Sequence, residues 1–277
     1  MINEMADTAR LAARTLSAAT GAERSAALNA IADAVLARSA EILAANEEDM
    51  VRAREAKIND SLQDRLLLTP ARIEGIAKSA REVSKLPDPL GITLRHSTLP
   101  NGIDLQQITV PFGVIGMVYE ARPNVTIDAA AILLMSGNAA LLRGSSSAAS
   151  SNQILVTVIK DALKTTKISP EVVQLVPSGD RETVTALLNA RGKIDLVIPR
   201  GSASLIRAVV DESRVPTIET GAGVCHVYVD EFADLSKAVP IIINSKTQRP
   251  SVCNAAETLL IHESIAKDFA PIALKAL

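Results

Sequence analysis

Cys253 lies in the polar segment QRPSVCN (residues 248–254), where a thiol has charged and turn-forming neighbours. A thiolate there could attack an activated acyl group and hold it as a thioester until a hydride arrives. Most cysteines are small buried hydrophobes, but the cation of Arg249 and a helix beginning after the turn would lower the pKa of this thiol. We therefore predict that Cys253 is a catalytic nucleophile.

Glu219 is a second candidate, because it ends a strand-like run and precedes the glycine-rich segment TGAG (residues 220–223). Glycines let the chain turn sharply and approach a ligand, so this carboxylate could act as a general base and Gly221 could contact a cofactor. The alternative is a strand-end carboxylate that caps the next turn, and the residues alone favour that alternative. The other cysteine, Cys225, lies in an alternating run and is interpreted as a strand residue.

Two other turns carry Gly, Ser and Arg between a strand and a helix N-terminus, LRGSSS (142–147) and PRGSAS (199–204). Backbone N–H groups and the helix dipole favour a phosphate there, and two such turns in one sheet outweigh plain serine-capped glycine turns. No G-x-G-x-x-G motif is evident, since GVIG at 113–116 is too weak a match. The predicted cofactor-binding residues in the two turns are Arg143, Gly144, Ser145, Arg200, Gly201 and Ser202.

The strand that ends at Arg143 offers an arginine and a serine cluster, where NAD-binding proteins carry an acidic residue for the ribose 2′-hydroxyl. This difference favours NADPH over NADH. Asn124, in the loop RPNVT (122–126) after the first strand, could donate its amide N–H to a developing oxyanion. Capping of the following helix is the commoner use of an asparagine at such a position.

Composition excludes several classes of protein. The 277 residues are 48% hydrophobic, which suits one large domain or two of ordinary size. A net charge of −2 without a basic stripe argues against nucleic-acid binding. No apolar run is long enough to span a bilayer, so we expect a cytoplasmic protein. The three histidines are scattered and the two cysteines lack C-x-x-C spacing, which argues against a metal site or a disulfide.

The hydrophobic pattern predicts the elements that position these residues. Ala, Leu and Ile recur at helical spacing from residue 1 to about residue 86, with breaks at Thr20-Gly21 and Thr69-Pro70. Two extended runs, 92–99 and 103–110, flank an Asn-Gly turn signal and predict a β-hairpin. A lone hairpin is marginally stable, so we expect this one to pair with another subunit.

From Pro111 onward, strands and helices alternate with short turns, which is typical of a parallel, doubly wound α/β sheet. The expected strands are 113–119, 139–143, 172–176, 194–198 and 217–219. The expected helices between them are 125–136, 147–164, 181–190 and 202–210. A strand at 225–229 leads away from that sheet. A second α/β unit is then expected to begin with helix 234–246, strand 258–262 and a helix from residue 263.

Together these segments resemble the γ-glutamyl phosphate reductase family of the aldehyde dehydrogenase superfamily, through nearly the whole chain. The resemblance is carried by DRLLLT (64–69), PFGVIG (111–116), EARPNVT (120–126), LRG (142–144), PRGS (199–202), ETGAG (219–223) and RPSVCN (249–254). It implies an aldehyde-dehydrogenase-like fold in three parts. They are an NADP(H)-binding domain (1–91 and 110–229) with a helical lead-in, an oligomerisation hairpin (92–109) and the beginning of a catalytic domain (230–277).

The resemblance implies NADPH-dependent reduction of L-glutamyl 5-phosphate to L-glutamate 5-semialdehyde, with release of phosphate, in proline biosynthesis. Cys253 would be the nucleophile, and its backbone N–H and the amide of Asn124 would form the oxyanion hole. Arg143 and Ser202 would contact the cofactor. Glu219 occupies the place where hydrolytic relatives keep a base that activates water, an attack that would waste this thioester. Glutamate 5-kinase as a partner and a homo-oligomer are also implied.

Two alternatives stay open. A hydrolytic or CoA-acylating aldehyde dehydrogenase would share the cysteine and the fold but release the thioester differently, so phosphate dependence separates the readings. The other alternative is an inactive cofactor-binding fragment, because members of the family continue well past the position of Leu277. For such a fragment we expect exposed apolar surface near Leu274 and Leu277.

Overall fold

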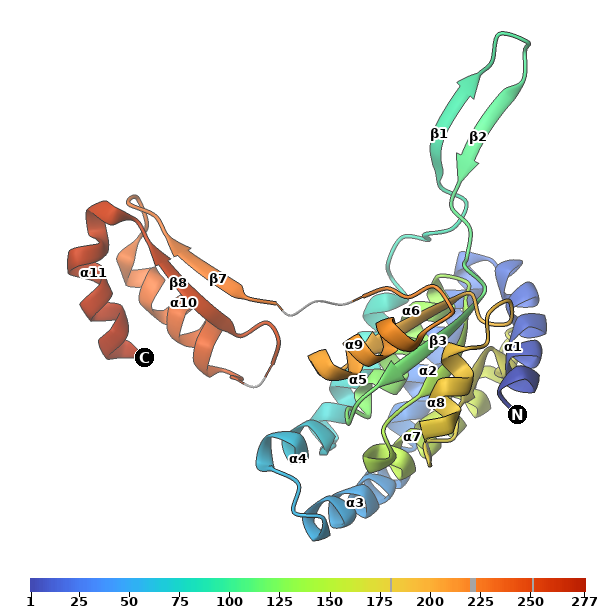
Figure 1. Ribbon diagram of the computed structural model, residues 1–277, viewed down its shortest axis with the longest axis horizontal. Coiled ribbons are helices and arrows are strands. Elements are labelled where there is room, and N and C mark those ends of the chain that lie inside the picture. Colours follow the sequence, from blue (N-terminus) through green and yellow to red (C-terminus); the bar gives the residue numbers. More distant parts are fainter. Residues whose placement is uncertain (180, 220–222, 251) are drawn as a thin grey trace. The chain divides into compact units, whose positions relative to one another are not determined.

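The computed structural model describes residues 1–277 except 180, 220–222 and 251 (Figure 1). The chain divides into two compact units, Met1–Thr220 and Gly221–Leu277. Each unit has its own apolar core among the described residues, so each is presented by itself. Within the described residues, no helix is both long and apolar enough to cross a membrane.

Helices form the first part of the larger unit, as the apolar periodicity predicted. They are α1 (Ile2–Ser17), α2 (Gly21–Ala37), α3 (Ser39–Glu55), α4 (Asp60–Leu66) and α5 (Pro70–Val83). Both predicted breaks are confirmed. Thr20 and Glu23 form a capping box at the start of α2, and Thr69 caps α5 with Pro70 at its first position. The buried faces of α1, α2 and α5 and the start of α3 join one core with the sheet that follows. Leu66 of α4 belongs instead to a smaller cluster with Met50, Ala53 and Ala148.

Four parallel strands form the sheet of this unit, in the order β5-β4-β3-β6. They are β3 (Val114–Tyr119), β4 (Ala139–Arg143), β5 (Val173–Leu175) and β6 (Leu196–Arg200). The helices that alternate with them are α6 (Asn124–Met135), α7 (Ala149–Leu163), α8 (Arg181–Leu188) and α9 (Ala203–Glu212). Because α6 and α7 pack with α2 while α8 packs with α1 and α9, the sheet has helices on both faces (Figure 1). The predicted doubly wound α/β fold is confirmed.

One predicted strand, 217–219, is wrong as a strand. Only an isolated parallel bridge joins Thr217 to Val197 of β6. The Val197 N–H donates to the Pro216 carbonyl, and the Ile218 N–H donates to the Val197 carbonyl. Two residues beyond Val197, Pro199 has no N–H with which to continue this ladder.

The predicted hairpin is present as β1 (Thr93–Thr98) and β2 (Asp104–Ile108), which pair antiparallel. Every residue of the two strands is exposed except Ser97, which is half-buried. The exposed apolar side chains of the strands and their flanks are Ile92, Leu94, Leu99, Ile103, Leu105, Ile108 and Val110. Pairing of this surface with a second copy of the chain remains a prediction.

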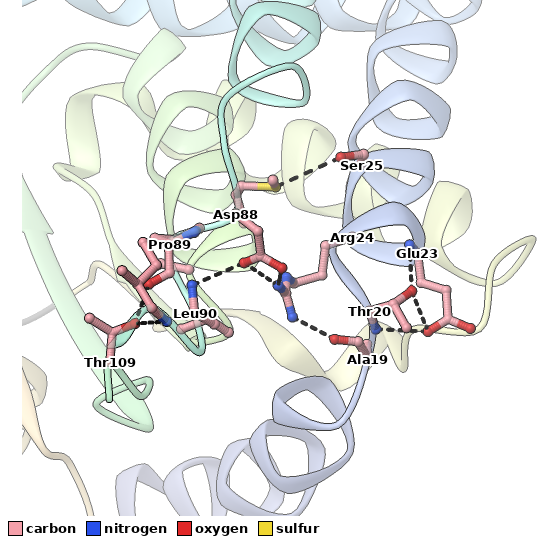
Figure 2. Close-up of polar contacts among 12 residues, drawn as sticks. Ala19, Thr20, Glu23, Arg24, Ser25, Asp88, Pro89, Leu90 and Thr109 are labelled. Carbon is pink, nitrogen blue, oxygen red and sulfur yellow. Dashed lines mark hydrogen bonds and ion pairs between the residues drawn. The ribbon is translucent and has the colours of Figure 1, made fainter. Parts of the chain in front are cut away.

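A polar cluster joins the base of the hairpin to the start of α2 (Figure 2). Arg24, only 2% exposed, donates from Nη2 to both carboxylate oxygens of Asp88 at 2.6 Å. Asp88 Oδ1 also accepts the Leu90 N–H at 3.0 Å. Thr109, at the end of the hairpin, donates its hydroxyl to the Pro89 carbonyl at 2.7 Å. The approach and exit of the hairpin are therefore tied to each other and to α2.

Because of this cluster, we expect the stability of the protein to depend on the absence of a side chain at Gly21, the first residue of α2. A Cβ at Gly21 would lie 2.6 Å from Asp88 Oδ2, whereas a Cβ at Gly75 in α5 would meet nothing within 4 Å. We expect Gly21→Ala to lower the free energy of unfolding by about 1–3 kcal/mol through overpacking. Gly75→Ala, the matched control, should raise it by about 0.5–1 kcal/mol. Urea unfolding of both variants measures the difference, and equal effects would contradict the importance of the Asp88 contact.

The second unit contains a parallel pair of strands, β7 (Cys225–Val229) and β8 (Ala256–Ile261), with helices α10 (Leu235–Thr247) and α11 (Glu263–Ala276). Its small core consists of Val229, Ala238, Ile242, Phe269 and Ala273. Because β7 pairs with β8, it belongs to this unit, in keeping with the predicted strand at 225–229 that leads away from the first sheet. The domain boundary at residue 229 that the family resemblance implies remains a prediction. Leu274 and Leu277 are 71% and 53% exposed, as expected.

Candidate active site

The carboxyl edge of the four-stranded sheet is the candidate cofactor site. From β3 the chain passes to β4 on one side, while β6 lies on the other side of β3, so the strand order reverses between β3 and β6. Doubly wound sheets bind ligands at the carboxyl ends of the strands beside such a reversal. Asn124 begins the helix after β3 there, Arg200 ends β6 with Gly201 and Ser202 next, and Arg143 ends the neighbouring β4.

Glu120 joins the two loops at this reversal. Its backbone N–H donates to the Arg200 carbonyl at 3.1 Å, which extends the pairing of β3 with β6. Its carboxylate accepts the Ser202 N–H at 3.0 Å and the Ser202 hydroxyl at 2.6 Å. Ser202 also caps α9, because its Oγ accepts the Leu205 N–H at 3.4 Å. The sequence patterns assign no role to Glu120, although it directly follows a strand and begins the EARPNVT segment that carries the family resemblance.

Gly201 is required by the close approach of Glu120. A Cβ at Gly201 would lie 2.7 Å from Glu120 Cδ and 2.7 Å from Leu205 Cδ2. The glycine therefore leaves the space in which a carboxylate reaches the start of α9. This geometry supports the prediction that the turn before α9 accommodates an anion.

The N-terminus of α7, at the other predicted phosphate turn, is closed by a buried carboxylate. Asp49 of α3 is fully buried and accepts the Ser150 N–H at 3.1 Å, the Ser151 N–H at 2.8 Å and the Ser151 hydroxyl at 2.6 Å. These are the donors with which the first turn of α7 could hold a phosphate. The start of α7 thus already holds a carboxylate from α3, and cofactor binding by Arg143, Gly144 and Ser145 remains a prediction.

Residues 143–145, which precede α7, lie at the carboxyl edge of the sheet. Arg143 donates from Nη2 to the Ser178 carbonyl at 3.4 Å, in the loop after β5. Ser145 caps a short 3₁₀ turn through the Ser147 N–H at 3.3 Å. Gly144 is buried, and a Cβ there would lie 2.1 Å from Asn152 Nδ2, so no side chain fits. The structure therefore places Arg143, Gly144 and Ser145 beside the β3–β6 reversal.

A buried polar chain lies beneath Gly144. Thr126 donates its hydroxyl to Asn152 Oδ1 at 2.9 Å, so the Tyr119 hydroxyl, 2.8 Å from Thr126 Oγ1, is the donor in that contact. Burial raises the pKa of Tyr119, which keeps the phenol protonated for this role. The network links the end of β3 and the start of α6 to α7. It therefore fixes the backbone from which the candidate cofactor-binding residues extend.

Asn124 is positioned by a carboxylate one turn along α6. Its Nδ2 donates to Asp128 Oδ2 at 2.9 Å, and the Ser79 hydroxyl donates to Asp128 Oδ1 at 3.2 Å. Burial raises the pKa of Asp128 above its ordinary value. The alternative use of Asn124 as a helix cap is not observed, because Pro123 is the N-cap and no side chain caps α6. One amide N–H is held by Asp128, and the second can serve another acceptor.

Cys253 belongs to the second unit, where its side chain is exposed in the turn between α10 and β8. The turn is held by the Val252 N–H, which donates to the Arg249 carbonyl at 3.3 Å. The thiol of Cys225 donates to the Cys253 carbonyl at 3.5 Å. The predicted helix start after the cysteine is wrong, because the turn leads into β8. A helix dipole therefore cannot act on this thiol from that side.

The two other candidate catalytic residues, Glu219 and Cys253, belong to different units. Glu219 is exposed at the end of the first unit, and Cys253 belongs to the second. Gly221 lies outside the described residues. The structure therefore brings together the predicted cofactor-binding residues of two turns with Asn124, all within the first unit.

The chain is similar to known proteins of a single family. The aldehyde dehydrogenase family matches residues 1–277. The γ-glutamyl phosphate reductase of Thermobifida fusca is 55% identical over 276 residues, which are 100% of this chain and 66% of that protein. That of Kineococcus radiotolerans is 52% identical over 269 residues, 97% of this chain and 62% of that protein.

Among solved structures, the γ-glutamyl phosphate reductase of Thermotoga maritima superposes with a TM-score of 0.87 at 45% sequence identity. The match covers 98% of this chain and 66% of the other. The chain thus spans somewhat less than two thirds of the length of these relatives.

Proposed function

Because the chain belongs to the aldehyde dehydrogenase family, we propose that it reduces L-glutamyl 5-phosphate to L-glutamate 5-semialdehyde with NADPH, releasing phosphate. The observation that supports this most directly is an exposed cysteine in the segment RPSVCN, in a chain 55% identical along its whole length to a γ-glutamyl phosphate reductase. The resemblance inferred from the sequence motifs is confirmed by the curated relatives. In the cell this reaction belongs to proline biosynthesis.

The chemistry assigned to the protein begins at Cys253. Its thiolate attacks the acyl carbon of the substrate, forming an S–C bond while phosphate leaves with the electrons of the broken C–O bond. The amide N–H of Asn124 that Asp128 does not hold stabilises the negative charge that develops on the acyl oxygen. When bound, NADPH supplies the hydride that reduces the thioester. The thiolate then departs with its electron pair, which frees the aldehyde and restores Cys253.

The residues at the carboxyl edge fit a phosphate-bearing dinucleotide. The Ser202 N–H and hydroxyl already hold a carboxylate at the start of α9, so this pair of donors suits an anionic oxygen. Gly201 leaves the space beside them. Arg143, at the end of β4, is the residue proposed to recognise the 2′-phosphate that distinguishes NADPH from NADH.

Three further features belong to the same proposal. The exposed hairpin pairs with a second copy of the chain in a homo-oligomer. The labile acyl phosphate is delivered by glutamate 5-kinase, and the reaction takes place in the cytoplasm. Glu219 has no step in this mechanism, because activation of water would hydrolyse the thioester before its reduction.

The test is the reverse reaction, followed as NADP⁺ reduction with glutamate 5-semialdehyde, with and without inorganic phosphate. Turnover that requires phosphate is the expected result, since phosphate must attack the thioester to release the acyl phosphate. Turnover without phosphate, or only with CoA, would indicate a hydrolytic or acylating aldehyde dehydrogenase instead. Cofactor binding with no turnover would leave a cofactor-binding chain and contradict the proposed reaction.

A further inference from the structure

We propose that Glu120 sets the affinity for NADPH by competing, through its own carboxylate, for the anion-binding start of α9. The inference rests on the proposed cofactor. Both Glu120 oxygens are engaged, one by the Ser202 N–H at 3.0 Å and the other by the Ser202 hydroxyl at 2.6 Å. These are the two donors at the head of α9 that the proposal assigns to a cofactor phosphate.

The competition follows from charge as well as from shared donors. Hydrogen bonds to a carboxylate are short and strong, and the N-terminus of a helix adds a favourable field for negative charge. A phosphate that arrives at Ser202 must either displace Glu120 or remain beside it. Displacement breaks two charge-assisted hydrogen bonds, and coexistence places two anions at one helix terminus. Either outcome weakens cofactor binding.

Asp49 and Glu120 each hold the start of a helix that follows a predicted phosphate turn, and their surroundings differ. Asp49 is fully buried at the start of α7 and accepts two backbone N–H groups together with the Ser151 hydroxyl. Glu120 is half-buried, its partner Ser202 is exposed, and it lies in the loop between β3 and α6. Withdrawal of Asp49 would leave buried donors unpaired, whereas withdrawal of Glu120 exposes its carboxylate and Ser202 to water. Of these two helix starts, that of α9 is therefore the one open to exchange between an internal and a bound anion.

An alternative role for Glu120 makes the opposite prediction. Acidic residues near the end of a strand in dinucleotide-binding sheets can accept hydrogen bonds from a ribose hydroxyl. In that role the carboxylate would contribute to cofactor affinity, and its removal would weaken binding. The sign of the change in affinity therefore separates competition from direct recognition.

The experiment measures the NADPH dissociation constant of the full chain by fluorescence titration, for the wild type, Glu120→Gln and Glu120→Ala. Neutralising a helix-terminal charge predicts binding about 3- to 10-fold tighter in both variants. Glu212→Gln is the matched control, because Glu212 ends α9 and forms an exposed ion pair with Arg181. It removes the same charge from the other end of the helix and should change the dissociation constant by less than about twofold.

The outcomes distinguish the inference from the function on which it depends. Wild-type binding with unchanged or weaker binding in both Glu120 variants would overturn the competition and leave the proposed cofactor intact. An equal gain in Glu212→Gln would also overturn it, because the effect would then be one of net charge. Absence of NADPH binding in every variant, with folding verified by circular dichroism, would reject both the cofactor and the inference. The alanine variant keeps the test decisive if the glutamine amide still bonds to Ser202.

Discussion

Cys253→Ala is expected to abolish phosphate-dependent NADP⁺ reduction, by a factor of roughly 10⁴ or more, because no other group would form the thioester. NADPH binding should remain within about twofold of wild type, since Arg143, Gly201 and Ser202, the residues proposed to hold its phosphates, lie in the first unit. The steady-state rate of NADP⁺ reduction and the dissociation constant of NADPH, measured for both proteins, show whether catalysis is lost while cofactor binding is kept.

The second cysteine supplies the matched control for that experiment. Cys225 is half-buried in β7, and its thiol makes one long contact with the Cys253 carbonyl, at 3.5 Å. Cys225→Ala should therefore retain activity within a few-fold of wild type. Iodoacetamide should label the exposed Cys253 faster than Cys225, because alkylation requires access to the thiolate. Retained turnover in Cys253→Ala, or equal losses in the two variants, would contradict the assignment of the nucleophile.

Asp49→Ala is expected to lower the free energy of unfolding by about 3–5 kcal/mol, the largest stability effect that we predict. The substitution removes a fully buried carboxylate that accepts the Ser150 and Ser151 N–H groups and the Ser151 hydroxyl. It also breaks the ion pair with Arg52 and leaves the start of α7 without its acceptor. Urea unfolding monitored by circular dichroism measures the loss.

An exposed ion pair provides the comparison for Asp49. Asp33 pairs with Arg81 across α2 and α5, where the aspartate side chain is 71% exposed. Asp33→Ala should cost less than about 1 kcal/mol, because water replaces the lost partner and screens the pair. A similar cost for the two alanine variants would show that the Asp49 carboxylate does not hold α7 in the way that its contacts indicate.

Most of the fold follows from patterns that are local in the sequence. The predicted strand 139–143 has the same bounds as β4, and the threonine and proline signals at Thr69 and Pro70 mark the start of α5. Apolar periodicity and capping act within a few residues, so the sequence alone contains them. The two wrong predictions concern segments whose structure depends on hydrogen bonding to a distant strand. Residues 217–219 form only a bridge because Pro199 interrupts the partner, and no helix follows Cys253 because its turn leads into β8.

In the candidate site, too, some residues can be recognised from local sequence and others cannot. Cys253, Asn124 and the two Gly-Ser turns are recognisable from residue types within short segments, and family resemblance adds their proposed roles. Asp49 cannot be found this way, because it closes α7 from a helix about a hundred residues earlier in the chain. Nothing in the segment around Asp49 indicates which helix start it will reach.

By itself, therefore, the sequence determined the doubly wound class, the hairpin, the family and the exposed-cysteine turn, because each depends on side chains near one another in the chain. Only the tertiary structure decided which carboxylate reaches which helix start. That depends on β6 lying beside β3, which brings Glu120 to Ser202, and on α3 packing against α7, which buries Asp49. Strand order and helix packing bring distant residues together through burial of the whole core, and no local pattern encodes those contacts.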